Sequence, residues 1–233
     1  MINQWKDELA AVADEGKIKI LSSFFKTGKG EYGEGDMFMG IKVPDNRAVA
    51  KKFFDAPYDV IELMLRSEIH EHRLSALLAL AERYRKTKDD ESRREILDFY
   101  LSHADRINNW DLVDLSAPQI VGEHQLRHPD PKLLDRLSMS DHMWTQRIAI
   151  VATYTLIKHR HLDDTYRLAE RYLSHTHPLI HKATGWMLRE AGKRDEVRLL
   201  QFLDRHAATM PRTALRYAIE RLSPELRNHY MGR

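Results

Sequence analysis

Apolar residues recur three and four positions apart along most of the chain, and this spacing predicts helices rather than strands. Alternation of apolar and polar residues, which marks a half-buried strand, is scarce. Three apolar stripes show the helical spacing: Leu74, Leu77, Leu78 and Ala81; Ile148, Val151, Ala152 and Thr155; Ala183, Met187, Leu188 and Ala191. We therefore predict an all-α protein of roughly a dozen helices in antiparallel pairs.

Prolines and glycines mark where these helices begin and end. Pro131, Pro178 and Pro211 stand near the starts of helical patterns, where a missing backbone N–H costs least. Gly192 follows a helical stretch and predicts its C-terminal end. Residues 26–39 contain the glycines at 28, 30, 33 and 35, so this segment cannot be helical throughout. We expect an ordered loop or a mobile flap there.

A basic residue stands near the head of four apolar helices, and their spacing indicates a repeat. The four are Arg73, Arg147, Lys182 and Arg212, separated by about 35 residues or by about twice that. A period near 35 to 40 residues is typical of stacked helical pairs, which form a curved solenoid with one extended concave face. We predict a single solenoid domain over residues 1–233. If the series lies on the concave face, that face suits a phosphate-rich polymer.

The segment 109–114 interrupts the basic series near the middle of its longest gap. Trp110 and Asp114 lie four residues apart and therefore share a helix face. An asparagine before them can cap the helix, and Asp111 in the first turn is explained by the helix dipole, so we give Asp111 no further role. Asp114 lacks that explanation. Asp114 either forms a salt bridge to Arg147 of the next repeat or belongs to a functional site.

Two tryptophans decide how this segment is interpreted. Trp110 alone is more often a core residue than a ligand contact. Trp186, however, follows Lys182 by four residues and shares a face with the basic series. A purely structural core would place these tryptophans opposite the basic residues.

Other motifs in the chain carry weaker signals. Gly28 to Gly33 matches G-x-G-x-x-G, but a helix precedes it and no βαβ unit surrounds it, so a dinucleotide site is not expected. The segment is a glycine-rich connector, or a loop whose Lys26, Lys29 and backbone amides contact phosphates. His177 and His181 stand four apart with no accompanying carboxylate, so we expect no metal. No nucleophile signature is present.

The composition of the chain says more about its cellular compartment than about its function. The net charge of +2 and the pI of 8.7 are too mild to prove nucleic-acid binding. Cysteine is absent, which excludes disulfides and cysteine-ligated zinc and fits a reducing cytosol. The N-terminus lacks the layout of a signal peptide, and no apolar run approaches the roughly 20 residues that span a bilayer. We expect a cytoplasmic protein, associated with the nucleoid if it binds DNA.

Several motifs together resemble the AlkD-like DNA alkylation repair family. They are Asn-Trp-Asp-Leu-Val-Asp at 109–114, Trp144 with Arg147, Lys-Ala-Thr-Gly-Trp-Met-Leu-Arg-Glu at 182–190, and Phe-Met-Gly-Ile-Lys-Val-Pro at 38–44 with Arg47. The resemblance covers the chain from about residue 20 to residue 222. It implies a fold of HEAT-like helical repeats and activity as a DNA glycosylase on alkylated purines.

The resemblance also implies roles for single residues. Asp114 would be the catalytic carboxylate, and Trp110 and Trp186 the aromatic residues near the sugar of the damaged nucleotide. Arg147 and Arg189 would hold the DNA backbone. Lys42 stands where some members place another polar side chain that contacts DNA. The implied reaction is hydrolysis of the N-glycosidic bond of N3- or N7-alkylated purines in duplex DNA, by a monofunctional enzyme without cofactor or metal. We expect a monomer.

The remaining candidates for DNA contacts are Arg73, Lys182, Arg212, Lys26 and Lys29. Four phosphate contacts from the basic series would give a log–log salt slope of about −3.6. One alternative is a non-catalytic repeat protein that binds DNA and senses its structure, with no release of damaged bases. Another is a protein–protein scaffold, the commonest use of helical solenoids. The behaviour of such a protein toward DNA would not change with salt concentration.

Overall fold

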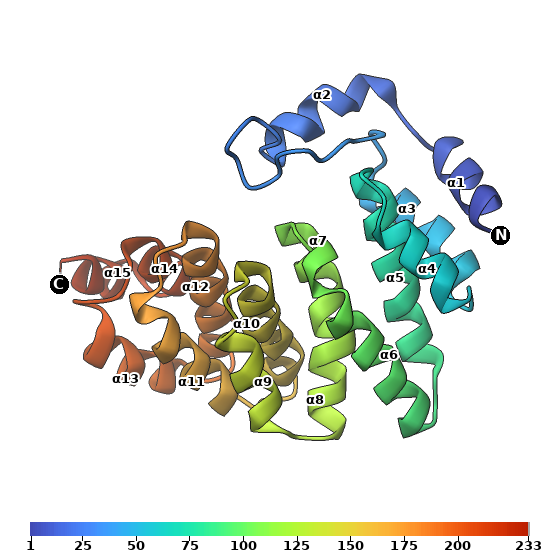
Figure 1. The fold of residues 1–233 in the computed structure, drawn as a ribbon. Coiled ribbons are helices and arrows are strands. Elements are labelled where there is room, and N and C mark those ends of the chain that lie inside the picture. Colours follow the sequence, from blue (N-terminus) through green and yellow to red (C-terminus); the bar gives the residue numbers. More distant parts are fainter. Residues whose placement is uncertain (233) are drawn as a thin grey trace. The chain divides into compact units, whose positions relative to one another are not determined.

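The computed structural model describes residues 1–232, and its regular elements are all helices (Figure 1). The described residues contain no β-strand, only an isolated bridge between Met37 and Ile69. The predicted all-α class is therefore confirmed. The chain divides into two compact units, Met1–Ile120 and Val121–Arg233. The single curved solenoid over residues 1–233 stays a prediction.

Unit 1 is built of helices α1 to α7. Their bounds are α1 Ile2–Ala10, α2 Glu15–Phe24, α3 Val43–Ala50, α4 Tyr58–Leu65, α5 His70–Lys86, α6 Asp90–Ser102 and α7 Trp110–Ala117, with short 3-10 turns at Lys51–Phe53 and Ala104–Arg106. Helix α5 is central, since α3, α4, α6 and α7 all pack against it. Trp5 anchors α1 to this core: its ring stacks on Phe53 at 4.9 Å and its Nε1–H donates to Ser75 Oγ at 2.8 Å.

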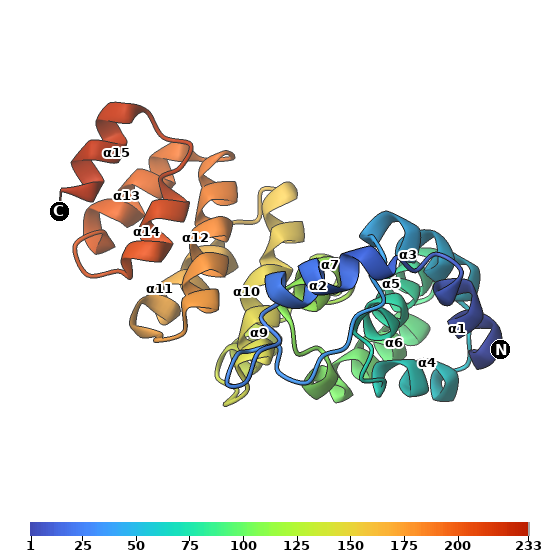
Figure 2. The same ribbon diagram turned by 90° about the horizontal axis from the view of Figure 1, so that it is seen from above.

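Helix α2 and the segment after it cover the ends of α5 and α7 at which those helices begin (Figures 1 and 2). As expected, residues 26–39 are not helical, and Gly30, Gly35 and Gly40 have positive φ. Gly40 also lies against the backbone of Asp14, where a Cβ atom would meet the carbonyl oxygen at 1.9 Å. Only glycine therefore lets this segment pass so close to the start of α2.

Unit 2 is built of helices α8 to α15 in two rows. Their bounds are α8 Glu123–Arg127, α9 Pro131–Ser138, α10 Met143–Lys158, α11 Asp163–Arg171, α12 Pro178–Gly192, α13 Glu196–His206, α14 Arg212–Ala218 and α15 Pro224–Met231, with a π-helical segment Pro118–Gly122 before α8 and a 3-10 turn at Tyr172–Ser174. Helices α10, α12 and α14 pack side by side, and α9, α11 and α13 pack against them (Figure 2). This arrangement agrees with a helical repeat of about 35 residues.

The predicted helix boundaries of unit 2 are confirmed. Helices α9 and α12 begin at Pro131 and Pro178, Pro211 immediately precedes α14, and α12 ends at Gly192. The two apolar stripes predicted in this unit, which begin at Ile148 and at Ala183, are buried. No helix within residues 1–232 has the length and apolar character that crossing a membrane requires.

Gly185 sets the distance between α12 and α14. A Cβ atom there would lie 2.4 Å from the carbonyl oxygen of Ala214 and 2.5 Å from Cβ of Tyr217. We expect Gly185→Ala to force the helices apart and to cost unit 2 about 1–3 kcal/mol. Gly16→Ala in α2 is the control, since its Cβ would meet only a side-chain oxygen at 3.2 Å. Hydrogen exchange over residues 178–218 measures the loss; unchanged protection in Gly185→Ala would contradict this account.

Candidate active site

Helix α7 presents the two residues that the sequence singled out. Asn109 precedes the helix, and its side-chain oxygen accepts a hydrogen bond from the backbone N–H of Trp110 at 2.8 Å, as expected of a cap. Trp110 and Asp114 follow one turn apart, and both are partly exposed. Asp114 is therefore not sealed from solvent, and Trp110 is not a fully buried core residue.

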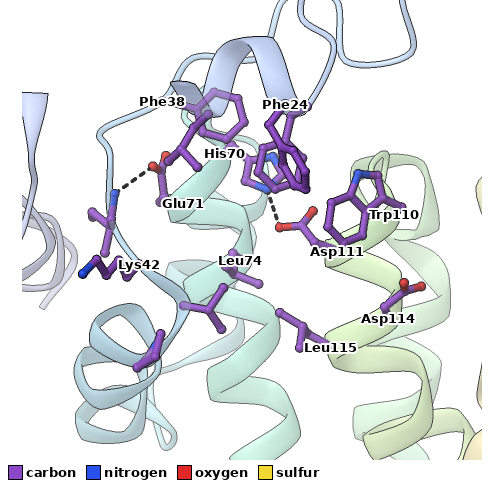
Figure 3. A pocket seen from close by; sticks show the side chains of 15 residues that line it. Phe24, Phe38, Lys42, His70, Glu71, Leu74, Trp110, Asp111, Asp114 and Leu115 are labelled. Carbon is purple, nitrogen blue, oxygen red and sulfur yellow. Dashed lines mark hydrogen bonds and ion pairs between the residues drawn. The ribbon is translucent and has the colours of Figure 1, made fainter. Parts of the chain in front are cut away.

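Both residues line a pocket of about 540 Å³ that lies entirely within unit 1. Its walls are formed by helices α2, α5 and α7, by the start of α3 and by the residues just before it (Figure 3). Most of the lining is apolar, and the polar or charged members are Lys42, His70, Glu71, Asp111 and Asp114. A ligand in this pocket would meet aromatic and aliphatic surface with a few charged groups, which is typical of binding sites for small organic groups.

A row of aromatic rings forms the upper wall of the pocket. Trp110 stacks on Phe25 at 5.1 Å between ring centroids, and Phe25 stacks on Phe38, also at 5.1 Å. Phe38 in turn stacks on the imidazole of His70 at 4.7 Å. Phe24 contacts Trp110 edge to face at 5.6 Å and is 60% exposed. These contacts fix Trp110 from the side of α2 and leave an exposed aromatic residue beside it.

Asp111 is more than a first-turn acid. It is buried, and its Oδ1 accepts from the backbone N–H of Leu112 at 2.8 Å. Its Oδ2 lies 2.8 Å from Nε2 of His70, an interaction drawn in Figure 3. The sequence suggested only that Asp111 interacts with the helix dipole. Its closest charged partner in the structure is instead His70. Helical spacing cannot reveal this pair, because the two residues are 41 positions apart.

Arg73 lies inside unit 1, which differs from the exposed DNA-binding position expected from the basic series. Its side chain is 1% exposed, and it donates to Asp36 Oδ1 at 2.6 Å and to the carbonyl oxygen of Ser67 at 2.9 Å. The guanidinium is therefore enclosed and paired with a carboxylate of the glycine-rich segment, whereas the sequence predicted an exposed side chain. A DNA contact by Arg73 stays a prediction.

The position of Lys42 depends on a buried acid, Glu71, that the spacing of residues in the sequence does not indicate. The carboxylate of Glu71 accepts from the backbone N–H groups of Met39, Gly40 and Ile41 at 2.9–3.2 Å. Lys42 follows directly and is exposed. The carboxylate thus replaces water for three backbone amides, and it holds the chain in place just before the lysine.

Lys26 and Lys29 are exposed on the loop after α2. Lys26 has φ of 57°, and its Nζ lies 3.9 Å from Glu31 Oε1. Carboxylates of the loop also accept from its own amides: Glu31 from Gly28 at 2.9 Å and Glu34 from Gly30 at 2.7 Å. The loop therefore has an internal order, and those two amides already have partners.

The other predicted DNA contacts belong to unit 2. Lys182 on α12 and Arg212 on α14 are exposed, and Arg212 donates to the carbonyl oxygen of Met231 at 2.6 Å. Arg147 on α10 is 4% exposed and donates to the carbonyl oxygen of Leu179 at 2.5 Å. Helix α12 is therefore joined to α10 by this arginine.

Trp186 and Arg189 lie on α12 after Lys182. Trp186 is partly exposed, and its ring is 5.6 Å from that of Tyr154 on α10. Arg189 forms ion pairs with Glu190 and Glu220. A phosphate at Arg189 would therefore compete with carboxylates, whereas Lys182 has its ammonium in solvent.

The comparisons with known proteins agree with this fold. The family model of DNA alkylation repair enzymes matches residues 5–222, and the chain therefore belongs to that family. The family defines a role in DNA repair with DNA as the partner. A solved structure described as a predicted DNA alkylation repair enzyme from Enterococcus faecalis has a TM-score of 0.72 and 17% identity, and the match covers 91% of this chain and 97% of that one. At this identity the likeness shows the fold alone. No curated protein matches the chain.

The exposure of Lys182 makes its contribution to DNA binding measurable. We expect Lys182→Gln to weaken DNA binding and to reduce the log–log salt slope by about 0.9, the effect of one lost phosphate contact. Lys193→Gln at the other end of α12 is the control, because Lys193 is already paired with Glu190 at 2.7 Å. Fluorescence anisotropy across a salt series measures both. Equal slopes for the two variants would remove Lys182 from the DNA contacts.

Proposed function

We propose that this protein is a monofunctional DNA glycosylase that hydrolyses the N-glycosidic bond of N3- and N7-alkylated purines in duplex DNA. The observation that carries the proposal is Asp114, a partly exposed carboxylate one turn from Trp110, beside an open pocket. The chain belongs to a family of DNA alkylation repair enzymes, which supplies the substrate class. An acid in that setting suits a reaction that develops positive charge.

The chemistry of such lesions requires little from the protein. A purine alkylated at N3 or N7 is already cationic, so the glycosidic electron pair moves to the base and the base leaves neutral without a general acid. The barrier is the oxocarbenium-like sugar. A carboxylate held near C1′ stabilises that cation by about 3–4 kcal/mol. Asp114 would also orient the water whose oxygen forms the new bond to C1′ and whose proton passes to solvent.

Trp110 would assist through its ring. An indole face beside a developing cation contributes about 1–2 kcal/mol when water is excluded. The ring of Trp110 is fixed by stacking on Phe25, so its orientation is set before DNA binds. Trp186 on α12 is the other tryptophan to which we assign a role near the sugar of the damaged nucleotide, and its ring is partly exposed. No lysine attacks the sugar, so the product is an abasic site in an intact strand.

Binding to the DNA backbone falls to cationic side chains of both units. We assign Lys42, Lys26 and Lys29 in unit 1 and Arg147, Lys182, Arg189 and Arg212 in unit 2 to this role. The enzyme would act as a monomer in the cytoplasm, on the DNA of the nucleoid, without a cofactor.

A base-release assay tests the proposal directly. Duplexes carrying 7-methylguanine or 3-methyladenine are incubated with excess protein, and free base and strand integrity are followed by chromatography and gel electrophoresis. We expect release of the alkylated base above the spontaneous rate, with strands cut only after alkali treatment. Tight binding to undamaged or branched DNA with no release from either substrate would instead select a non-catalytic DNA-structure-binding protein.

A further inference from the structure

The first four residues of α5 are polar, and all of them are buried. His70, Glu71, His72 and Arg73 begin the helix at the point where it meets the segment 36–41. Glu71 holds the later part of that segment through its amides, as described above. His70 and Arg73 hold its beginning through Asp36. We call Asp36, His70, Arg73 and Asp111 the His70 cluster.

The hydrogen bonds of His70 define its charge. Nδ1 lies 3.1 Å from Asp36 Oδ2, and Nε2 lies 2.8 Å from Asp111 Oδ2. An ionised carboxylate only accepts hydrogen bonds, so both ring nitrogens must donate. Only the protonated imidazole has two N–H groups. With both carboxylates ionised, this geometry therefore requires an imidazolium that joins two acids from different parts of unit 1.

The surroundings of the ring support the charged form. Burial disfavours it, but the charge and hydrogen bond of Asp111 and the hydrogen bond of Asp36 outweigh burial and raise the pKa of His70 to about 9. Arg73, on the same helix, opposes this rise. Helix α2 and the segment 36–41 otherwise present rings to the imidazole, Phe25 at 4.9 Å and Phe38 at 4.7 Å.

The His70 cluster reaches the reacting residues by two routes. Asp111 is the neighbour of Trp110 in the chain and lies in the first turn of α7, the helix that also carries Asp114. The ring of His70 contacts Phe25, which stacks on Trp110 at 5.1 Å. A loss of the imidazolium bridge would therefore release the head of α7 and the aromatic wall together.

We propose that His70 is a positioning residue for base excision: it joins the end of the glycine-rich segment, through Asp36, to the first turn of α7, through Asp111, and so fixes Trp110 and Asp114. His70 does not touch the DNA. This inference rests on the proposed function for its catalytic readout, but its structural part is measurable without activity.

The catalytic test uses His70→Gln under single-turnover conditions, with DNA affinity measured in parallel. We expect base release to fall on the order of 100-fold near neutral pH, since misplacement by about 1 Å costs that much, while DNA affinity stays within a fewfold of the parent. His159→Gln, an exposed site at the end of α10, is the control for the same substitution. Equal base-release rates for the parent and His70→Gln, at a temperature where both proteins are folded, would show a merely structural role and overturn the proposal.

The pH dependence of the ratio of base-release rates, parent over His70→Gln, makes this test more specific. Effects of pH on the DNA itself are the same for both proteins and cancel in this ratio. The folded-state pKa of His70 is raised from 6.5 to about 9, so the bridge is complete at neutral pH and is lost as the pH rises through about 9. We expect the ratio to fall toward one over that range. A ratio that stays constant up to about pH 10 would contradict the proposal.

A second readout does not depend on catalysis. Histidine Cε1–H resonances are followed by NMR from about pH 6 to 10, with His70 assigned by its loss in His70→Gln, and the indole N–H of Trp110 is followed in the same titration. We expect both signals to move with one midpoint near 9 in the parent. In Asp111→Asn, which keeps the shape but removes one charge, that midpoint should fall.

The two readouts separate failure of this inference from failure of the proposed function. If the parent releases no base but Trp110 follows the His70 titration, the glycosylase proposal fails while the positioning link stands. If base release is found but Trp110 does not respond to His70 and His70→Gln releases base at the parent's rate, the positioning role is refuted and the glycosylase proposal stands.

Discussion

Asp114→Asn should slow base release from a 7-methylguanine duplex by about 10²–10³-fold while leaving DNA binding intact. Asparagine keeps the size of the side chain but removes the negative charge that stabilises the oxocarbenium-like sugar. Loss of one preorganised group of this kind costs about 3–4 kcal/mol, equivalent to a rate reduction of about 10²–10³-fold. Single-turnover release at saturating protein measures the chemical step, and fluorescence anisotropy with the same duplex measures binding.

The matched control is Asp98→Asn on α6, an exposed acid of the same unit that is paired with Arg94. This variant should release base at the parent's rate. Equal release by Asp114→Asn and the parent would refute the catalytic assignment. Reduced unfolding free energy in Asp114→Asn together with unchanged base release would favour the alternative left open by the sequence, in which the acid serves a structural ion pair.

The helices could be predicted because the signals that form them are local. The stripes beginning at Leu74, Ile148 and Ala183 have the helical period, and Pro178 and Gly192 mark the two ends of α12. Each of these signals depends on residues within a few positions of one another. The division of the chain into two compact units has no such local signal, because it falls between Ile120 and Val121, inside the helical segment Pro118–Gly122 and not in a link between helices.

The candidate site was predictable only where its residues are close in sequence. Trp110 and Asp114 share α7, so spacing alone puts them on one face. The partners of His70 are Asp36 and Asp111, which lie 34 and 41 positions away. Periodicity contains no information on such pairs. The polar run at the head of α5 was the available signal, since four consecutive polar residues cannot all face solvent on one helix.

The basic series shows what the spacing of residues in the sequence can and cannot predict. The spacing of about 35 residues correctly places its members near helix starts. It does not determine which side of the helix each one faces. Lys182 and Arg212 are exposed, whereas Arg73 is enclosed by the glycine-rich segment that is far from it in sequence. A count of phosphate contacts taken from the series would therefore include two buried side chains that already have partners, Arg73 and Arg147.

Arg73→Met is expected to destabilise unit 1 strongly. The substitution keeps most of the side-chain volume but leaves the buried carboxylate of Asp36 without its 2.6 Å partner. Breaking a buried ion pair from one side costs about 3–5 kcal/mol. Asp36 keeps its second partner, His70 at 3.1 Å, so we expect a loss at the lower end of this range, about 3 kcal/mol. Urea unfolding followed by hydrogen exchange resolves the two units, and the loss should appear in peptides from residues 1–120. Arg94→Met, in an exposed pair on α6, should cost less than about 1 kcal/mol.

Asp36→Asn distinguishes a structural Arg73 from one that contacts DNA. If Arg73 serves only unit 1, removal of its partner lowers the protection of residues 1–120 and leaves the salt slope of DNA binding unchanged. If Arg73 can contact DNA once it is no longer paired with Asp36, the same substitution frees the guanidinium. The log–log salt slope of DNA binding then becomes steeper by about 0.9. The enclosure of Arg73 at 1% exposure favours the first result. A steeper slope with unchanged protection would restore Arg73 to the DNA-binding series that its spacing suggests.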